Sequence, residues 1–187
     1  MEKVILSSEE ISRICERLGK KISEEYAAAK HPPVLLCVMK GALNFTGDLM
    51  KHITIDVDFD YVQVQSWSGT KSTGKITMTK EVSTDLNGRD VIIVEDIVDT
   101  GLSMHYLLGH LREISKPSSI KVCALFNKSK GRKIPVNVDF IGYELEDDAF
   151  LVGYGLDYRG LVRNVPYVFV PSEDQIKHWD ELKEGDN

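Results

Sequence analysis

Short apolar runs recur along the chain at lengths typical of buried strands. VLLCVM (34–39), VIIV (91–94) and IKVCALF (120–126) are almost wholly apolar, as expected for central strands of a sheet that is covered on both faces. ITIDVDFDYVQVQ (53–65) and ITMTKEV (76–82) instead alternate apolar and polar residues. This alternation predicts two further strands, joined by a loop rich in Gly, Ser and Thr.

Helical periodicity fills the intervals between these strands. Residues 7–30 begin with a Ser-x-x-Glu capping box and place apolar residues three or four positions apart, which predicts an amphipathic helix. We expect a shorter helix within 40–52. A third helix should follow Gly101, because one apolar face continues from there until Pro117 ends the pattern.

The last third of the chain is less regular. Its apolar segments predict strands at 138–144, 150–155 and 165–170, and Ser172 with Gln175 marks the start of a final short helix. Strands separated by helices in the first two-thirds favour an α/β fold with a parallel, doubly wound sheet. The irregular C-terminal portion is expected to fold back over that sheet.

Composition limits the kinds of protein that this chain can be. Its 187 residues, 42% of them hydrophobic, suit one globular domain spanning 1–187. A net charge of −6 argues against a nucleic-acid partner, because such proteins need a basic face. We find neither a signal-peptide core nor an apolar segment long enough for a bilayer, so we expect a cytoplasmic protein without a membrane partner. Cys15, Cys37 and Cys123 are odd in number and far apart, which predicts reduced, buried thiols.

The segment VIIVEDIVDTGLSM (91–104) carries the densest chemistry. Glu95, Asp96 and Asp99 directly follow a buried strand, where burial and mutual repulsion are unfavourable without a cationic or hydroxyl-rich partner. In a parallel sheet, ligands bind beyond the carboxyl ends of the strands. Glu95 and Asp96 can accept from the vicinal hydroxyls of a ribose, directly or through hydrated magnesium. Alternatively, the pair is a solvated charge cluster in a turn.

The residues that follow are suited to a phosphate. A Thr-Gly turn that runs into a helix presents successive backbone N–H groups, and the hydroxyls of Thr100 and Ser103 lie beside them. Neither GxxxxGK[ST] nor GxGxxG occurs in the chain. We therefore expect a monophosphate.

VIIVEDIVDTG (91–101) resembles the signature of the type I phosphoribosyltransferases, and residues 5–171 resemble the hypoxanthine-guanine members of that family, which act in purine salvage. The resemblance implies transfer from 5-phosphoribosyl 1-pyrophosphate to hypoxanthine or guanine, with Mg2+ as cofactor. It also implies a small C-terminal hood, a mobile lid loop and association into a homodimer or homotetramer. The residues it assigns to the phosphoribosyl group are Glu95, Asp96, Asp99, Thr100, Gly101, Leu102 and Ser103.

VMKGALNF (38–45) resembles the pyrophosphate loop of the family. By this resemblance, Lys40 and Gly41 bind the diphosphate, and the family's non-proline cis peptide falls between Met39 and Lys40. Alternatively, Lys40 is a surface lysine at the start of a helix.

SWSGTKSTG (66–74) resembles the lid of the family, which excludes water from the reacting sugar. Ser66 and Trp67 stand where the family has a Ser-Tyr pair, so the aromatic shape is kept and the phenol hydroxyl is lost. An exposed linker between two strands would have the same composition.

FLVGYGLDYRGLVRN (150–164) resembles the segment that holds the base. Phe150 would stack on the purine, and Leu151 would offer backbone groups to its Watson–Crick edge. Asp157 would lie at the purine site and contact magnesium near the pyrophosphate, and Arg163 would contact the diphosphate. Taken alone, Phe150 is typical of a core aromatic, and the two charged residues are typical of a surface.

Lys128 and Asp99 complete the implied site. Lys128, in FNKSKGRK, resembles the lysine that donates to the purine 6-oxo group, although a solvated basic loop would have the same sequence. Asp99 resembles the residue beside purine N7 that takes or returns a proton. The implied metal ligands are Glu95, Asp96 and Asp157.

A protein of another class would share this signature. A regulator can keep the phosphoribosyl site to sense a ligand while it binds RNA or DNA. The acidic composition and the complete set of implied site residues disfavour this alternative.

Overall fold

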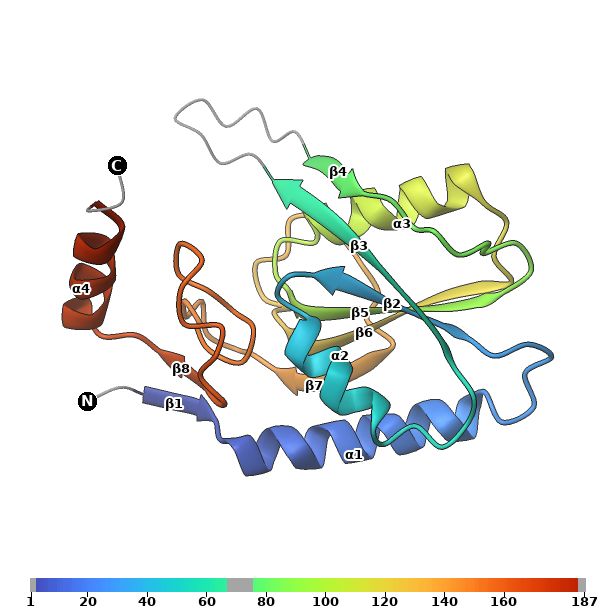
Figure 1. Ribbon diagram of the computed structural model, residues 1–187, viewed down its shortest axis with the longest axis horizontal. Coiled ribbons are helices and arrows are strands. Elements are labelled where there is room, and N and C mark those ends of the chain that lie inside the picture. The colour runs from blue at the N-terminus through green and yellow to red at the C-terminus, as the bar shows by residue number, and fades with distance from the viewer. Residues whose placement is uncertain (1–2, 67–75, 185–187) are drawn as a thin grey trace.

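A six-stranded sheet forms the centre of the computed structural model, which describes residues 3–66 and 76–184 (Figure 1). The strand order is β4-β3-β2-β5-β6-β7, with β4 antiparallel to β3 and the other neighbours parallel. This order confirms the predicted parallel sheet. The strands are β2 (Val34–Met39), β3 (Asp58–Ser66), β4 (Ile76–Lys80), β5 (Asp90–Val98), β6 (Ser119–Asn127) and β7 (Phe140–Glu144).

Helices cover both faces of this sheet, as a doubly wound fold requires (Figure 1). One face packs on α1 (Ser8–Glu25) and α2 (Leu43–Met50), and the other packs on α3 (Leu102–Ile114). Consecutive strand residues point to opposite faces, so Ile92 belongs to the core under α1 and Ile93 to the core under α3. None of the described helices has both the length and the apolar character that a membrane crossing requires.

The hood consists of β1 and residues 150–184, so it combines both ends of the described chain. β1 (Lys3–Leu6) pairs antiparallel with β8 (Val168–Val170), and α4 (Glu173–Glu184) follows β8. The predicted capping boxes are present at α1 and α4. At α4, for example, the Ser172 N–H donates to Gln175 Oε1 at 2.9 Å. In Figure 1 the hood lies beside the central sheet, with α4 at its outer side.

Two predicted strands are shorter in the structure, and one strand was not predicted. The strand predicted at 53–65 begins only at Asp58, because its neighbour β2 begins at Val34 after two prolines that lack an N–H. Of the segment predicted as a strand at 165–170, only β8 forms a strand. β1 was not predicted from the sequence.

The segment 150–155 is a series of turns, where the sequence analysis predicted a strand. Its regular pairing is limited to two isolated bridges, from Val152 to Phe169 and from Gly153 to Leu156. Gly153 and Gly155 have φ of 94° and 107°, which belong to a region that only glycine visits freely. These turns keep the backbone of the hood close to the carboxyl ends of β5 and β6.

Candidate active site

Two cavities meet at the carboxyl end of β5. The smaller, of about 100 Å³, is lined by Glu95 and by residues 97–104. The larger, of about 320 Å³, is lined by residues of β5 and of the hood. The site predicted from the sequence therefore lies where parallel sheets bind ligands.

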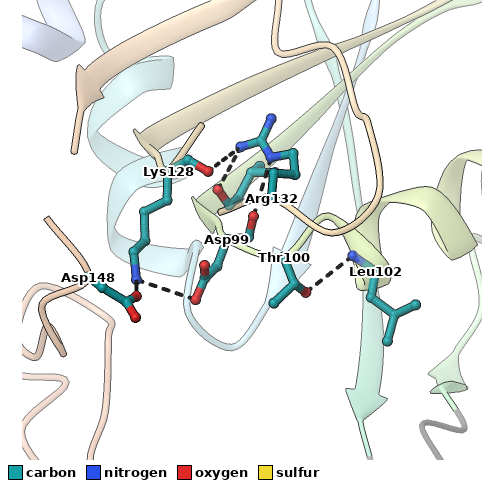
Figure 2. Close-up of polar contacts among 7 residues, drawn as sticks. Asp99, Thr100, Leu102, Lys128, Arg132 and Asp148 are labelled. Atoms are coloured by element: carbon teal, nitrogen blue, oxygen red, sulfur yellow. Dashed lines mark hydrogen bonds and ion pairs between the residues drawn. The ribbon is translucent and has the colours of Figure 1, made fainter. Parts of the chain in front are cut away.

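The smaller cavity is built as a cradle for an anion. Gly101 has φ of 82° and begins α3, and a Cβ at this position would lie 2.3 Å from the carbonyl oxygen of Ile134. The Thr100 carbonyl accepts hydrogen bonds from the N–H groups of Lys133 and Ile134 at 3.1 and 3.0 Å, which fixes the turn. The N-cap residue Gly101 has no side chain to cap α3, and the Leu102 N–H donates to Thr100 Oγ1 at 3.4 Å, so the Thr100 hydroxyl and the first turn of α3 lie together where a phosphate would bind (Figure 2).

Glu95 lines the smaller cavity, and its neighbour Asp96 lines the larger one. Burial, together with the negative charge of Asp96, raises the pKa of Glu95 well above its ordinary value. Burial also raises the pKa of Asp96, although a 2.7 Å hydrogen bond from the Ile97 N–H and the charge of Arg163 oppose this effect. Two crowded carboxylates of this kind favour a bound cation.

The loop at Lys40 contacts both the acidic pair and the hood. The peptide bond between Met39 and Lys40 is cis, as the family resemblance predicts. A Cβ on Gly41 would fall 1.7 Å from Oδ2 of Asp96, and a Cβ on Gly155 would fall 2.1 Å from the carbonyl oxygen of Gly41. Only glycine at positions 41 and 155 permits the loop to lie so close to Asp96 and to the hood. The exposed Lys40, next to Gly41, therefore lies at the edge of the site.

Asp157 and Arg163 form an ion pair inside the hood. Their closest atoms, Asp157 Oδ1 and Arg163 Nη2, are 2.6 Å apart, and the Gly160 N–H donates to the other carboxylate oxygen at 2.6 Å. Among the described residues, no three His, Cys, Asp or Glu side chains gather closely enough to hold a metal. Glu95, Asp96 and Asp157 therefore do not form such a cluster, although Asp96 and Asp157 line the same cavity, and their role as metal ligands stays a prediction.

The larger cavity unites the residues that the sequence analysis assigned to the purine. Its lining includes Lys128, Phe150, Leu151 and Asp157, with Asp99 at the boundary to the phosphate cradle. Phe150 is 52% exposed and is therefore not a core aromatic. Its ring meets the ring of Tyr158 edge-on, with centroids 6.0 Å apart.

Lys128 points into this cavity between two carboxylates (Figure 2). Its side chain is only 7% exposed, and Nζ lies 2.7 Å from Asp148 Oδ1 and 3.5 Å from Asp99 Oδ2. Burial by itself would lower the pKa of Lys128, but the hydrogen bond to Asp148 and the charge of Asp99 outweigh it and raise this pKa. A buried, paired ammonium argues against the alternative of a solvated loop lysine.

The sequence analysis missed Asp148 and Arg132. The Arg132 guanidinium donates to the backbone carbonyls of Val98, Asp99, Lys128 and Val136, and also to Asn127 Oδ1. It thereby joins the ends of β5 and β6 and fixes the loop that carries Lys128 (Figure 2). In the sequence, both residues lie within charged runs that are typical of exposed loops, so no local signal marked them.

The lid residues are only partly described. Ser66 is the last residue of β3, and Trp67 lies outside the described residues. The predicted lid loop therefore stays a prediction.

The fold and the site can be compared with known proteins. The model of the phosphoribosyl transferase domain family matches residues 3–159. The hypoxanthine-guanine phosphoribosyltransferase of Bacillus subtilis is 42% identical over 171 residues, which cover 91% of this chain and 93% of that enzyme. The hypoxanthine-guanine-xanthine phosphoribosyltransferase of Tritrichomonas foetus is 38% identical and covers 92% of this chain and 93% of its own length.

Solved structures agree with this assignment. A crystal structure of a hypoxanthine phosphoribosyltransferase from Staphylococcus aureus matches with a TM-score of 0.84 and 34% identity, and the match covers 92% of each chain. The chain therefore belongs to the phosphoribosyltransferase family, among its hypoxanthine-guanine phosphoribosyltransferases.

Proposed function

We propose that this enzyme transfers the 5-phosphoribosyl group from 5-phosphoribosyl 1-pyrophosphate to hypoxanthine or guanine, which yields IMP or GMP and pyrophosphate. The observation that carries this proposal is the larger cavity. It brings Lys128, Phe150 and Asp99 together directly beside a cradle suited to a phosphate. Its volume of about 320 Å³ is that of a site for a small, flat ligand.

Three groups recognise the base in this proposal. Phe150 stacks on the purine ring, and the backbone of Leu151 pairs with its Watson–Crick edge. Lys128 donates to the 6-oxo group. An ammonium has three N–H donors, so Lys128 can bind this oxygen while it keeps its hydrogen bond to Asp148.

The phosphoribosyl group lies on both sides of Asp99, with its phosphate in the smaller cavity and its ribose at Glu95 and Asp96. The N–H groups of residues 100–103 bind its 5-phosphate, and Glu95 and Asp96 accept from the ribose hydroxyls. Lys40, Gly41 and Arg163 hold the pyrophosphate. These positions place the anomeric carbon between the base and the leaving group, so attack from the opposite side inverts its configuration.

Asp99 is the proton-transfer group. The base loses its N7 proton as the glycosidic bond forms, and a carboxylate beside N7 accepts that proton. Asp99 is half-exposed, and its Oδ2 lies 3.5 Å from Lys128 Nζ where the two cavities meet.

Mg2+ fits the acidic pair. Glu95 and Asp96 offer hard oxygen donors, and their crowding makes a cation favourable. Magnesium usually takes one or two carboxylates together with substrate oxygens and waters, so a third protein carboxylate is not needed. When bound, the ion neutralises charge on the pyrophosphate as it leaves.

We also propose that the enzyme acts in the cytoplasm as a homodimer or homotetramer, with no nucleic-acid partner. Cys15, Cys37 and Cys123 are buried and unpaired, which suits a reducing compartment. The net charge of −6 opposes binding to a polyanion.

One assay tests the main proposal. The purified enzyme is incubated with 5-phosphoribosyl 1-pyrophosphate, Mg2+ and, in turn, hypoxanthine, guanine, xanthine and adenine, and the nucleotide and pyrophosphate formed are measured. We expect rapid formation of IMP and GMP. If none of the four bases gave a nucleotide while the protein bound RNA, the chain would be a regulator.

A further inference from the structure

The C-terminal helix α4 is fastened to residues beside the purine cavity. The ring of Trp179 lies against that of Tyr158, with centroids 5.8 Å apart and planes inclined at 40°. The Tyr158 hydroxyl donates to Asp180 Oδ1 at 3.0 Å, and Arg159 donates to the same oxygen at 2.9 Å. One turn of α4 thus holds two consecutive residues of the hood loop.

Tyr158 in turn supports the ring proposed to stack on the base. The rings of Phe150 and Tyr158 are almost perpendicular, at 83°, with centroids 6.0 Å apart. This edge-to-face geometry is the favourable one for an aromatic pair. Half of Phe150 is exposed, so the contact with Tyr158 restricts a side chain that the core does not enclose.

The position of α4 does not depend on a buried face. None of its residues between Glu173 and Glu184 is fully buried. In Figure 1 the helix stands at the outer edge of the hood, apart from the helices that cover the central sheet. Trp179 and Asp180 supply its side-chain contacts to Tyr158 and Arg159.

The hood loop between Phe150 and Arg163 needs such support. Arg159 and Val162 have φ of 50° and 72°, values that are unfavourable for residues with a side chain. Backbone of this kind persists where surrounding contacts hold it in place. The ion pair between Arg159 and Asp180 supplies one of these contacts.

We propose that α4 positions the purine platform of the active site. Trp179 and Asp180 hold Tyr158, and Tyr158 holds Phe150 at the angle that stacking on a purine requires. A ring that is already fixed loses less conformational freedom when the base binds, so the base binds more tightly. This inference rests on the proposed function, and it makes Trp179 and Asp180 positioning residues that do not touch the substrate.

The first test is kinetic. Removing one aromatic contact in Trp179→Ala should raise the KM for hypoxanthine and guanine about 3- to 10-fold, the worth of one aromatic pair. The kcat and the KM for 5-phosphoribosyl 1-pyrophosphate should change less than about twofold, since Phe150 touches only the base. Trp179→Phe should restore most of the affinity. The matched control is Lys177→Ala, an exposed residue of the same helix, which should behave as wild type.

The second test reads the contact directly by fluorescence. The chain has two tryptophans, so the difference between the emission of wild type and that of Trp179→Phe isolates Trp179. Titration with IMP should change this difference in a saturable manner. Asp180→Ala should weaken IMP binding about 3- to 10-fold, because the Tyr158 hydroxyl loses its acceptor.

The outcomes separate this inference from the function on which it rests. If Trp179→Ala and Asp180→Ala remained folded by circular dichroism and bound hypoxanthine and IMP as wild type does, α4 would have no positioning role, while the proposed activity would stand. An equal rise in KM for both substrates would also overturn the inference, since a general loosening of the fold would explain it. A wild-type enzyme that neither bound IMP nor used hypoxanthine would overturn the proposed function, and this inference with it.

Discussion

Lys128 is buried beside two carboxylates, those of Asp99 and Asp148, which differ in their exposure to solvent. Asp148 is almost fully exposed and holds the ammonium at 2.7 Å, whereas Asp99 lies deeper, at 3.5 Å. The exposed carboxylate keeps Lys128 charged and directed into the cavity. The deeper one is the group that we propose for proton transfer, and the three side chains line the same cavity.

Lys128→Ala should change which base is used. Adenine presents a 6-amino donor to the ammonium, and sites built on such hydrogen bonds discriminate by about 10⁴ in kcat/KM. We expect wild type to exclude adenine. In the variant, activity with hypoxanthine should fall and the gap to adenine should narrow, because the carboxylates of Asp99 and Asp148 can accept from the 6-amino group. The control is Lys130→Ala, an exposed lysine of the same loop. An unchanged ranking of the four bases would contradict the role of Lys128.

Asp99→Asn should act on the chemical step. The amide keeps the shape of the side chain but cannot accept the N7 proton, so kcat should fall by about 10² to 10⁴ with little change in substrate affinity. Steady-state kinetics with hypoxanthine at saturating 5-phosphoribosyl 1-pyrophosphate measure this. A kcat equal to that of wild type would remove Asp99 from proton transfer.

Glu95→Gln should change the pH dependence of stability. The pKa of Glu95 in the folded protein is raised, so this group destabilises the metal-free fold increasingly as the pH rises from its ordinary value, near 4.5, towards the raised value. Glutamine does not ionise, so the variant avoids this loss of folding stability. The stability of the variant relative to wild type should therefore increase between pH 5 and pH 8, as measured by urea unfolding in EDTA. A difference in stability between variant and wild type that did not change with pH would contradict the raised pKa of Glu95.

Two glycines of α3, one at its start and one in its interior, differ in what they contribute. Gly101 turns the chain into the phosphate cradle, where a Cβ would meet the Ile134 carbonyl oxygen at 2.3 Å. Gly109 lies in the same helix, and a Cβ there would meet nothing within 4 Å. The first glycine is needed for the geometry of the cradle, whereas the second only weakens the helix.

Alanine at each glycine tests this distinction. Gly101→Ala should raise the KM for 5-phosphoribosyl 1-pyrophosphate about tenfold or more and destabilise the fold by about 1–3 kcal/mol, since φ is positive and the cradle is filled. Gly109→Ala should stabilise the fold by about 0.4–1 kcal/mol with unchanged kinetics. Thermal unfolding and substrate titration measure both effects. Equal behaviour of the two variants would show that the cradle tolerates a side chain.

Across the whole molecule, the site is assembled from segments that are distant in the sequence. The loop after β2, the end of β5, the loop after β6 and the hood each supply charged or polar groups. The acidic pair and the basic residues thus come together only in the folded chain. Its ligand should therefore carry both phosphate and a cation.

Removal of divalent metal should abolish turnover. The pyrophosphate leaving group is highly charged, and Glu95 with Asp96 forms a crowded acidic pair that favours a cation. Activity in excess EDTA should fall to background and return when Mg2+ is added beyond the chelator. Full turnover in metal-stripped buffer would contradict the proposed cofactor.

Local patterns in the sequence determined the central sheet and much of the site. Continuous apolar runs marked β2, β5 and β6 because strands buried on both faces exclude polar residues. The capping boxes at Ser7 and Ser172 fixed the starts of α1 and α4 because their hydrogen bonds span only three residues. The signature at 91–104 indicated a phosphoribosyl site because its groups are contiguous in the chain.

Only the tertiary structure decided the hood and the pairings within the site. Lys3 pairs with Val170, Lys128 with Asp148 and Asp157 with Arg163. In the hood, the apolar segment 150–155 runs through turns with positive φ, so its composition resembles that of a strand although its backbone does not. Hydrophobic periodicity indicates which side of a segment is buried, but it does not identify the residue on the other side of the contact. A pairing between distant residues is set by the packing of the whole chain, so the sequence could not show that Asp157 pairs with Arg163.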